Sequence, residues 1–362
     1  MMYVSSLKLT NFRNFEQAEF TFDQAKTAIW ADNARGKSNV LEALYFLALA
    51  KSGRGARDRD VLKWGANYFV IEALIEREDR SFPIRIAYDP LVGKKQASLA
   101  ETSLPRLSDL IGAFNAVLFS PEDVDLVLRE PAQRRRILDI LVSQSSASYL
   151  ADLEGYQRVL AQRNRLLKDR SSALLSHPEQ VEPWNEQLSN LGARIISRRL
   201  EALNDIQHLL SEYYHAIAPT SEKMKASYRS PISLETREQG REILFEALTT
   251  RLPQEVELRY TLTGPHRDNL IFTLDDKAVH QFASKGQLKT VLLSWKLAEA
   301  TFLEQQTGWR PVLLMDDVFS ELDPKRANAL LNLIPDFGQV VVTSARDPDL
   351  DFETHGFRLL KL

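Results

Sequence analysis

The sequence predicts an α/β fold in which mixed sheets with flanking helices are interrupted by an inserted helical lobe. Three observations predict this class. Apolar residues recur at every second position near both ends of the chain, which is the period of half-buried strands. They recur at helical spacing in the middle of the chain. A glycine and a lysine, Gly36 and Lys37, follow an apolar run and precede a helical pattern.

The N-terminal part is predicted to form strands around one helix. The strand predictions depend on the pairs Leu7/Leu9 and Phe20/Phe22, the apolar run Thr27 to Trp30, and the alternation of Val70, Ile84, Ile86 and Tyr88. Turn residues at Asp89-Pro90 and Gly93 interrupt the alternation of residues 68 to 100. The helix is expected directly after Lys37.

The middle of the chain is predicted to be a helical hairpin. Near residue 120 the period changes, and residues 133 to 170 have apolar side chains at helical spacing. A polar stretch with prolines, 171 to 183, precedes a second long helical pattern over 184 to 217. Residues 256 to 274 return to alternation.

The C-terminal part then continues with a helix, an apolar strand at Val312 to Met315, another helix, and a strand at Gln339 to Thr343. We therefore expect one strand-rich lobe in two halves, residues 1–105 and 255–362, with a helical lobe at 106–254 between them.

Composition excludes several classes of protein. The 362 residues carry a net charge of −3, so bulk charge predicts no partner. Without cysteine, disulfides and cysteine-ligated zinc are excluded, and the six histidines lack metal-ligand spacing. The apolar run Val40 to Ala50 is too short for a bilayer, which takes ~20 residues. The N-terminus reads as a strand and not as a signal peptide, so we expect a cytoplasmic protein without a membrane partner.

The segment around Gly36 and Lys37 predicts a phosphate-binding loop. It reads Ala31-Asp32-Asn33-Ala34-Arg35-Gly36-Lys37-Ser38, with Asn39 following. In such loops backbone amides and a helix N-terminus face an anion, the lysine reaches the β- and γ-phosphates of ATP, and the hydroxyl ligates Mg²⁺. The alternative is a strand–helix turn with a lysine cap.

Two acids after the apolar strand predict a second part of the same site. Asp316 and Asp317 follow Met315, at the end of a buried strand where a magnesium nucleotide would lie. Asp316 would hold Mg²⁺ through water, and Asp317 would orient or activate the attacking water. The alternative is an ordinary strand followed by an acidic helix cap.

A serine and a glycine before a helix predict a third part. Ser284, Gly286 and Gln287 resemble the signature segment of ABC ATPases, in which a serine and helix N-terminal amides hold a phosphate. The segment Ser320 to Asp323 resembles the D-loop of that class. The resemblance implies an ATP-dependent homodimer with two nucleotides sandwiched head to tail. For the signature alone, the alternative is an N-capped helix.

Taken in order, several segments resemble the RecF family of bacterial replication and repair proteins. They are Asn11 to Asn14, Asp32 to Ala43, Phe119 to Asp123, Arg134 to Asp139, Gly264 to Asp268 and Asp316 to Asp323. The resemblance implies an ABC-type P-loop ATPase head that hydrolyses ATP weakly and dimerises with ATP on gapped DNA or single-strand/double-strand junctions. It also implies that RecR and RecO are partners in loading RecA. The chain departs from the family pattern at Trp30-Ala31, Arg129-Glu130, Lys285 and Leu288.

Basic residues give candidates for DNA contact. Arg57 lies after the first helix, where related SMC-like heads couple nucleotide to DNA, and Arg134, Arg135 and Arg136 form the densest basic run. Arg54, Arg59, Arg163, Arg165, Lys168 and Arg170 are further basic residues. The alternative for each is a solvated helix face or an ion pair that holds the lobes together. Aromatic residues are not interleaved with these cations, so base stacking is not predicted.

Two functions remain open on the sequence. One is a DNA-dependent ATPase that assembles repair factors, and the other is an ATP-regulated scaffold on DNA in which hydrolysis is dispensable. An OLD-type nuclease needs a carboxylate domain after Asp317, for which the chain has no room. The short insertion excludes a long-armed SMC protein. A transporter subunit fits badly because the strand ending at Thr343 is followed directly by Ser344 and not by a histidine.

Overall fold

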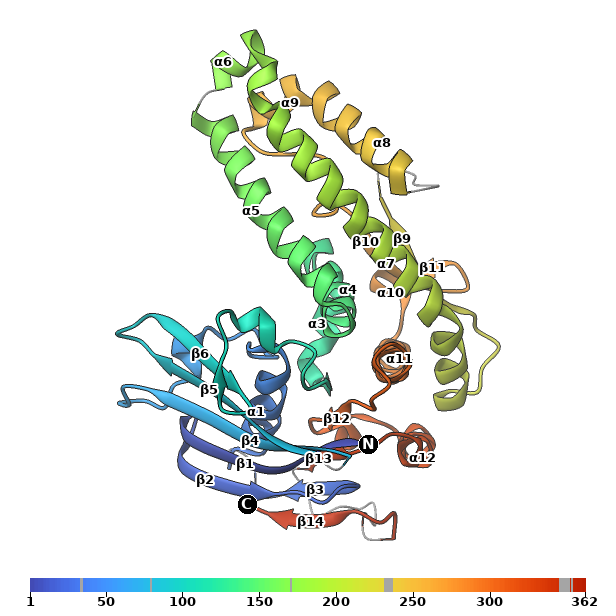
Figure 1. The fold of residues 1–362 in the computed structure, drawn as a ribbon. Helices are drawn as coiled ribbons and strands as arrows, with labels where there is room; N and C mark the ends of the chain where they lie inside the picture. Colours follow the sequence, from blue (N-terminus) through green and yellow to red (C-terminus); the bar gives the residue numbers. More distant parts are fainter. Residues whose placement is uncertain (33–34, 79, 170, 231–236, 345–351, 353) are drawn as a thin grey trace. The chain divides into compact units, whose positions relative to one another are not determined.

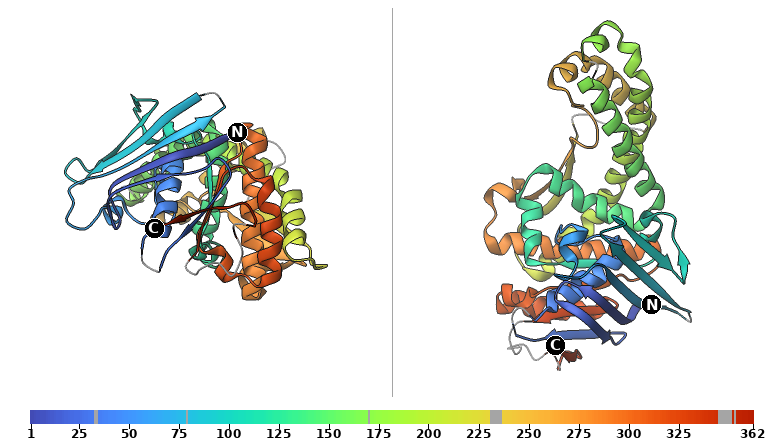
Figure 2. Two further views of the ribbon diagram at one scale, coloured as in Figure 1. Left: turned by 90° about the horizontal axis from the view of Figure 1, so that it is seen from below. Right: turned by 90° about the vertical axis from the view of Figure 1, so that its left-hand side faces the viewer.

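Two compact units make up the described part of the chain. The computed structural model describes residues 1–32, 35–78, 80–169, 171–230, 237–344, 352 and 354–362. Unit 1 comprises Met1–Asp125, Leu209–Glu222 and Ala283–Leu362, and unit 2 comprises Leu126–His208 and Lys223–Phe282. Each unit is therefore assembled from segments that are far apart in the sequence (Figures 1 and 2).

A six-stranded antiparallel sheet forms one layer of unit 1. Its strands, in spatial order, are β2 (Phe15–Thr21), β1 (Met2–Phe12), β4 (Phe69–Arg77), β5 (Arg80–Asp89), β6 (Lys94–Leu99) and β7 (Thr102–Ser103). Leu7, Ile84 and Ile86 are fully buried on one face of this sheet. The alternation predicted for the N-terminal part is therefore confirmed.

A five-stranded parallel sheet forms the second layer of unit 1. Its order is β14 (Arg358–Lys361), β3 (Lys26–Trp30), β13 (Val340–Ser344), β12 (Val312–Met315) and β8 (Ala116–Phe119). All four residues of β12 and of β8 are buried, as expected for parallel strands covered on both faces. The carboxyl ends of β3, β13 and β12 lie next to one another, at the edge where α/β sheets bind ligands.

Helix α1 (Lys37–Leu49) contacts strands of both sheets (Figure 1). The run Val40 to Leu49 has apolar residues on every face of the helix apart from Glu42, so the helix can be buried on all sides. The other helical elements of unit 1 are α2 (Asp58–Val61), α11 (Lys285–Thr307), α12 (Pro324–Leu333), η1 (Leu107–Leu110), η2 (Pro121–Asp123), η4 (Val318–Glu321) and η5 (Ile334–Asp336). No helix in the described ranges is both long enough and apolar enough to cross a bilayer.

Unit 2 is mainly helical and contains a small sheet. Its helices are α4 (Pro131–Ser145), α5 (Ala147–Asp169), α6 (Ser171–Ser176), η3 (Pro178–Val181), α8 (Arg237–Thr250), α9 (Leu252–Leu258) and α10 (Val279–Phe282), while α3 (Val124–Leu128) and α7 (Glu182–Ile217) run from one unit into the other. The sheet is antiparallel, in the order β11 (Lys277–Ala278), β10 (Asn269–Leu274) and β9 (Met224–Arg229).

The long helix predicted over 184–217 is observed as α7, but the helix predicted over 133–170 is wrong as a single element. It is divided into α4 and α5 at Ser146, whose backbone is extended. The Ser146 hydroxyl accepts a hydrogen bond from the Tyr149 amide at 3.2 Å, so this serine caps the start of α5. A capping serine within an apolar periodicity is easily missed, because the stripe continues on both sides of it.

The units and the predicted lobes have different boundaries. Strand β8 was expected in the helical lobe at 106–254, but it pairs with β12 in the parallel sheet of unit 1. Residues 255–282 were expected in the ATPase half, but they belong to unit 2 because β10 pairs with β9. Alternation in a sequence indicates a strand and leaves open which sheet the strand joins.

Candidate nucleotide-binding site

The loop between β3 and α1 brings its glycine against the turn between β1 and β2. Gly36 has a φ of 104°, and a Cβ at this position would lie 2.6 Å from the Asn14 amide nitrogen. Asn14 donates a hydrogen bond to the Arg35 carbonyl (3.0 Å) and accepts one from Asn39 (2.8 Å). Only glycine therefore fits at position 36. The predicted loop residues Asn33 and Ala34 lie outside the described residues.

Lys37 is the first residue of α1, and its side chain is 7% exposed. Its ammonium group donates hydrogen bonds to the carbonyl oxygens of Ala31 (2.5 Å) and Asp32 (2.9 Å). Burial lowers the pKa of Lys37, and the carboxylates of Asp317, Asp316 and Asp32 oppose that shift. A partly desolvated cation at a helix N-terminus is suited to an anionic ligand.

Asp316 connects the end of β12 to the start of α1. The Ser38 hydroxyl donates to Asp316 Oδ1 at 2.7 Å, and the Thr343 hydroxyl donates to the same oxygen at 2.7 Å. Arg54 pairs with the other oxygen at 2.8 Å. Ser38 and Asp316 are 278 positions apart in the sequence and meet because β3 and β12 are both in the parallel sheet.

The hydroxyl and carboxylate oxygens of Ser38 and Asp316 fit a magnesium ion. Mg²⁺ prefers hard oxygen ligands, and in nucleotide sites it takes one or two from the protein and the rest from phosphates and water. Within the described ranges, no group of three or more His, Cys, Asp and Glu side chains is placed to hold a metal ion. A magnesium ion here would therefore need phosphate oxygens as well.

Asp317 has a strained backbone and a carboxylate oxygen available for a ligand. Its φ is 48°, in the left-handed region that few residues other than glycine, asparagine and aspartate adopt. Its amide donates to the Thr343 hydroxyl at 2.9 Å. Its Oδ1 is buried and has no hydrogen-bond partner among the residues described. Buried polar atoms are nearly always paired, so this oxygen marks a place for a water or a ligand.

The predicted signature segment forms the N-terminus of α11. Ser284 caps the helix: its hydroxyl accepts from the Gln287 amide (3.2 Å), and its own amide donates to Gln287 Oε1 (2.8 Å). Gln287 Nε2 donates to Glu222 (2.5 Å), which also accepts from the Tyr214 hydroxyl (2.7 Å). The N-capped helix is therefore present, and the end of α7 is bonded to it through Glu222.

The predicted D-loop is attached to the same helix. Lys289, on α11, donates to the carbonyl oxygen (2.7 Å) and the carboxylate (2.5 Å) of Glu321. Arg326 pairs with Asp323 and donates to Thr290 on α11 at 2.9 Å. The signature helix and the segment Ser320 to Asp323 are therefore joined by side-chain bonds on two sides.

Sequence reasoning missed several residues that hold the site together. Thr343 and Arg54 bond directly to Asp316. Glu42, on α1, is 1% exposed and accepts a bidentate hydrogen bond from Arg13 (2.8 and 2.7 Å). The position of Thr343 at the end of its strand was a usable signal, because ligands gather at that edge. The partners of Arg54 and Glu42 depend on tertiary contacts that no spacing reveals.

The structure uses two of the predicted DNA-contacting arginines internally. Arg134 is 4% exposed, and its guanidinium donates to Asn269 (2.9 Å) and to the carbonyl of Arg129. Arg135 donates to the Asp268 carbonyl at 2.6 Å. These bonds favour the structural alternative for both residues. Arg136 is half-buried, and Arg57 is exposed at the start of α2.

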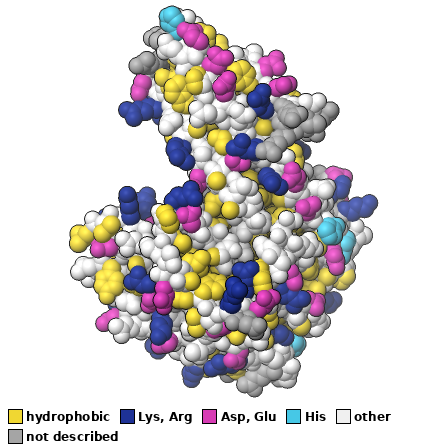
Figure 3. Space-filling view, viewed as in Figure 1, with side chains coloured by type: hydrophobic (Ala, Val, Ile, Leu, Met, Phe, Trp, Pro, Cys, Tyr) yellow, Lys and Arg dark blue, Asp and Glu magenta, His cyan; other side chains and the backbone are white. Residues whose placement is uncertain are grey.

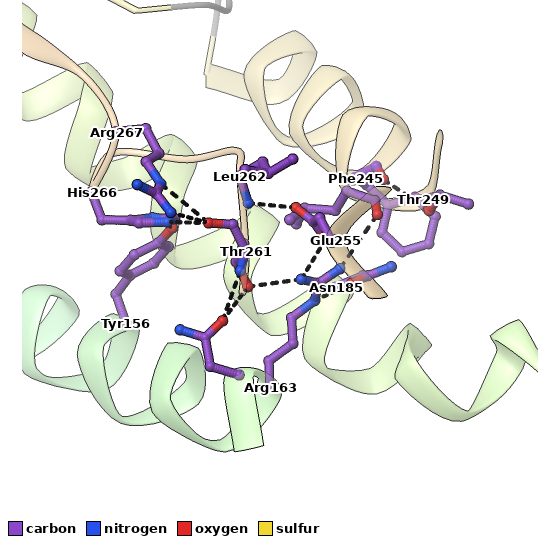
Figure 4. Close-up of polar contacts among 12 residues, drawn as sticks. Tyr156, Arg163, Asn185, Phe245, Thr249, Glu255, Thr261, Leu262, His266 and Arg267 are labelled. Carbon is purple, nitrogen blue, oxygen red and sulfur yellow. Dashed lines mark hydrogen bonds and ion pairs between the residues drawn. The ribbon is translucent and has the colours of Figure 1, made fainter. Parts of the chain in front are cut away.

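Arg163 is part of a polar network that includes His266 and Arg267 of the segment Gly264 to Asp268 (Figure 4). Arg163 and Glu255 form an ion pair at 2.7 Å in which both side chains are 0% exposed. His266 Nε2 lies 3.1 Å from the Thr261 carbonyl oxygen and Nδ1 lies 2.8 Å from the Tyr156 hydroxyl. A carbonyl only accepts, so Nε2 carries the proton and Nδ1 accepts from the tyrosine. For Arg163, the ion-pair alternative is the one observed.

A glycine–lysine loop between a parallel strand and a buried helix, two acids at the end of a neighbouring strand, and a capped helix after the inserted lobe occur together in one fold. This is the fold of an ABC-type P-loop ATPase head of the kind found in SMC proteins. A solved head domain supports the same fold: the Smc head domain with an extended coiled coil from Pyrococcus furiosus has a TM-score of 0.58 at 19% identity and covers 100% of this chain and 93% of that chain.

Within that class, the chain belongs to the RecF family. The family model described as RecF/RecN/SMC N terminal domain matches residues 3–358. A protein of Halalkalibacterium halodurans named DNA replication and repair protein RecF is 36% identical over 357 residues, which cover 98% of this chain and 95% of that protein. The protein of the same name from Lactobacillus johnsonii is 35% identical, over 95% of this chain and 92% of that protein.

Solved RecF structures have the same fold over almost the whole chain. One is described as the recombination mediator protein RecF-ATPrS in the RecFOR pathway; it has a TM-score of 0.89 at 30% identity and covers 100% of this chain and 96% of that chain. A second, described as RecF-ATP, has a TM-score of 0.89 at 31% identity, covering 97% and 94%. The family and fold expected from the sequence are thereby confirmed.

Proposed function

We propose that this chain binds ATP with Mg²⁺, dimerises around two ATP molecules, and acts on DNA as a recombination mediator in replication and repair. The observation that carries the proposal is the 2.7 Å hydrogen bond between Ser38 and Asp316, which joins the phosphate loop to the acid strand. If the two motifs matched only by chance, Ser38 and Asp316 would not be expected to lie within hydrogen-bond distance. The RecF structures described with ATP and with ATPrS support the same ligand.

In the proposed site, each of the chain's own groups has one task. The loop amides and the Lys37 ammonium hold the phosphates, since this cation is already partly desolvated. Ser38 and Asp316 hold the magnesium ion, which would neutralise phosphate charge. Asp317 positions the attacking water with its buried, unpartnered Oδ1. Weak hydrolysis is part of the proposal because the RecF family resemblance implies it; the departures at Ala31 and Lys285 remove no phosphate or metal ligand.

We propose a dimer because the polar groups of the signature segment already have partners away from the phosphate loop, although both segments belong to unit 1. Ser284 and Gln287 bond to each other and to Glu222. A Cβ at Gly286 would meet Arg326 Nη1 at 3.4 Å, an ordinary contact, so packing within the chain does not require glycine there. A phosphate held by a second copy of the chain would explain the glycine at 286. Without a Cβ at this position, the backbone amides can approach that phosphate closely.

DNA, RecR and RecO are the proposed macromolecular partners. The family membership and the RecFOR description of the solved relatives support this part of the proposal. Gapped DNA or a single-strand/double-strand junction is the proposed substrate, and loading of RecA is the proposed outcome. Arg57 and Arg136 remain candidates for phosphate contact, because each retains solvent exposure.

Binding of a fluorescent ATP analogue tests the nucleotide site. Lys37→Ala should abolish binding, because the cation that faces the phosphates is removed. Lys51→Ala is the matched control: this lysine lies just beyond the end of α1 and is exposed, so its removal should leave binding unchanged. If Lys37→Ala binds the analogue like wild type, the assignment of the loop is wrong.

A second candidate is an ATP-regulated scaffold on DNA in which hydrolysis is dispensable. The departures at Ala31 and next to the signature favour it, because they alter the loop and the helix N-terminus without removing a phosphate or metal ligand. Both candidates require ATP binding and dimerisation. They differ in whether repair depends on Asp317.

A further inference from the structure

One end of the six-stranded sheet exposes an unusual set of apolar side chains. Trp64 is 101% exposed, Leu91 is 92%, Val92 is 57% and Tyr68 is 48%. In Figure 3, hydrophobic side chains gather at the left edge, where Figure 1 has the free ends of β5 and β6. Exposed apolar patches of this kind mark interaction sites more often than they mark accidents.

The sheet register places these residues at the same end. Phe69 pairs with Tyr88, so Tyr68 and the turn before it adjoin the point where β5 ends. Asp89 pairs with Lys94, and Leu91 and Val92 form the tip between these strands. Arg57 is the N-cap residue of α2 and Arg59 lies on that helix, seven and five residues before Trp64 in the sequence. We call these six residues, Arg57, Arg59, Trp64, Tyr68, Leu91 and Val92, the sheet-end surface.

Hydrogen bonds hold the backbone of the sheet-end surface in place. The Lys63 amide donates to the Asn11 carbonyl (2.8 Å), and the Ala66 amide closes the turn on Lys63 (3.0 Å). At the other tip, the Leu91 amide donates to the Asp89 carboxylate at 2.8 Å. Beneath it, the buried rings of Phe12 and Phe69 pack edge to face with centroids 5.7 Å apart, and the buried ring of Tyr88 packs at a tilt on Phe69 at 5.5 Å. The backbone on both sides of Trp64 is therefore fixed, while its side chain is fully exposed.

The sheet-end surface carries two arginines, which alternate in the sequence with Asp58 and Asp60; Asp58 is itself paired with Lys95 at 2.6 Å. Arg57 and Arg59 are exposed, and neither takes part in an ion pair within the described ranges. Nearby, Lys63 is paired with Glu16 at 3.1 Å, and the Asp60 carboxylate accepts from the Arg57 amide at 3.2 Å. The surface therefore combines two free guanidinium groups with a flat aromatic side chain, the combination that binds single-stranded nucleic acid.

The same turn that anchors Trp64 also touches the phosphate loop. Arg13 donates from its backbone to the Val61 carbonyl (2.7 Å) and from its side chain to the Asp60 carbonyl (2.9 Å). The next residue, Asn14, bonds to Arg35 and Asn39 of the phosphate loop. Four hydrogen bonds therefore connect this turn with α2 on one side and with the phosphate loop and α1 on the other.

We propose that the sheet-end surface binds unpaired bases of single-stranded DNA beside a duplex, with Trp64 stacked on a base and Arg57 and Arg59 on the adjoining phosphates. The proposal rests on the proposed function, and it names the part of a junction that the protein reads. Bases present free faces along a strand only where they are unpaired. A blunt duplex exposes base faces at its two ends alone and otherwise offers this surface only phosphates.

The test measures binding of labelled DNA to the full chain with ATP, by fluorescence anisotropy. Three DNAs are compared: a duplex with a single-stranded tail, the same DNA with abasic sites in the tail, and the blunt duplex. Stacking on one base contributes roughly 10- to 100-fold to affinity. Trp64→Ala should therefore weaken binding of the tailed duplex about tenfold or more and leave the blunt duplex unchanged, and Trp64→Phe should retain most of the affinity.

Three controls make the result specific. On the abasic tail, Trp64→Ala and wild type should bind equally, because no base remains to stack. Leu175→Ala removes another exposed apolar side chain, 56% exposed in unit 2, and should change nothing. Arg57→Ala should lower the slope of log affinity against log salt by about one, whereas Trp64→Ala should leave that slope unchanged.

Unchanged binding of the tailed duplex by Trp64→Ala overturns the inference. If that variant instead loses ATP-induced dimers, the surface contacts a second copy, and if it loses binding to a protein partner, the surface is a protein-docking site; either result also overturns it. The proposed function fails separately, if wild type with ATP binds neither the tailed nor the blunt DNA. ATP binding by Trp64→Ala at wild-type strength shows that the variant is folded.

Discussion

Replacing Asp317 with asparagine removes a carboxylate charge while preserving the shape of the site. The backbone of Asp317 is left-handed, with φ 48°, and asparagine adopts this conformation about as readily as aspartate. The amide–Thr343 hydrogen bond is made by the main chain and is retained. Asp317→Asn should therefore fold and bind ATP, with affinity equal to or higher than that of wild type, since a negative charge near the phosphates is lost.

Hydrolysis should respond differently. Asp317 Oδ1 is buried and has no hydrogen-bond partner in the described part of the chain, so it is free to accept from a water molecule. A neutral amide orients that water less strongly and cannot take its proton. The loss of a general base lowers a rate by roughly 10²- to 10⁴-fold.

Phosphate release in a single turnover, with ATP and gapped DNA, measures this rate. Asp336→Asn is a suitable control, because Asp336 is exposed at the end of η5 and its loss should have no effect. Hydrolysis by Asp317→Asn within about threefold of wild type would refute the role given to this carboxylate. If the variant hydrolyses slowly but still supports repair in cells, the scaffold candidate is favoured over the ATPase that depends on turnover.

Three further predictions concern the helix contacts around the site and the inserted unit. Glu222→Ala should leave ATP binding intact but weaken ATP-induced dimers, because Gln287 loses an acceptor, whereas Glu222→Gln should restore them; light scattering that shows equal dimers for both variants would contradict this role. Arg163→Met should lower the free energy of unfolding by about 3–5 kcal/mol in urea, because it leaves Glu255 charged and unpaired at 0% exposure, and Glu255→Leu added to it should recover most of the loss. Burial lowers the pKa of His266 from 6.5 to about 4, so the unfolded chain takes up a proton below pH 6.5 that the folded chain does not. The free energy of unfolding should therefore be about 2 kcal/mol lower at pH 5 than at pH 7 because of this histidine. His266→Gln should remove this difference from a plot of the free energy of unfolding against pH. Identical plots for the two proteins would show that His266 is not the titrating group.

The nucleotide motifs could be predicted from the sequence because their geometry is local. A strand, a glycine–lysine loop and a helix in succession place Lys37 at a helix N-terminus whatever the rest of the fold does. Asp316 was expected at the end of its strand, and it lies beside Ser38 because parallel strands end at a common edge. In both cases the spacing of residues fixes the position of the functional atoms.

Other features depend on tertiary contacts and could not be predicted in this way. Arg134 and Arg163 lie in basic stretches, but their guanidinium groups bond to internal partners more than 90 positions away in sequence, Asn269 and Glu255 among them. The sheet-end surface was missed for a similar reason. Trp64 lies several residues from the nearest arginine, and its exposure became evident only when the sheet register was known.

Mixing two inactive variants tests most directly whether ATP is clasped between two copies. Lys37→Ala retains Ser284 but cannot hold ATP, and Ser284→Arg retains Lys37 but blocks the helix that would receive the phosphate. Neither should form dimers with ATP on its own. An equimolar mixture should form heterodimers, because one of the two composite sites then has an intact lysine facing an intact serine. Sedimentation velocity with ATP and without ATP measures this: dimers in the mixture alone are predicted, and a mixture that stays monomeric, or Ser284→Arg that dimerises alone, would contradict a shared site.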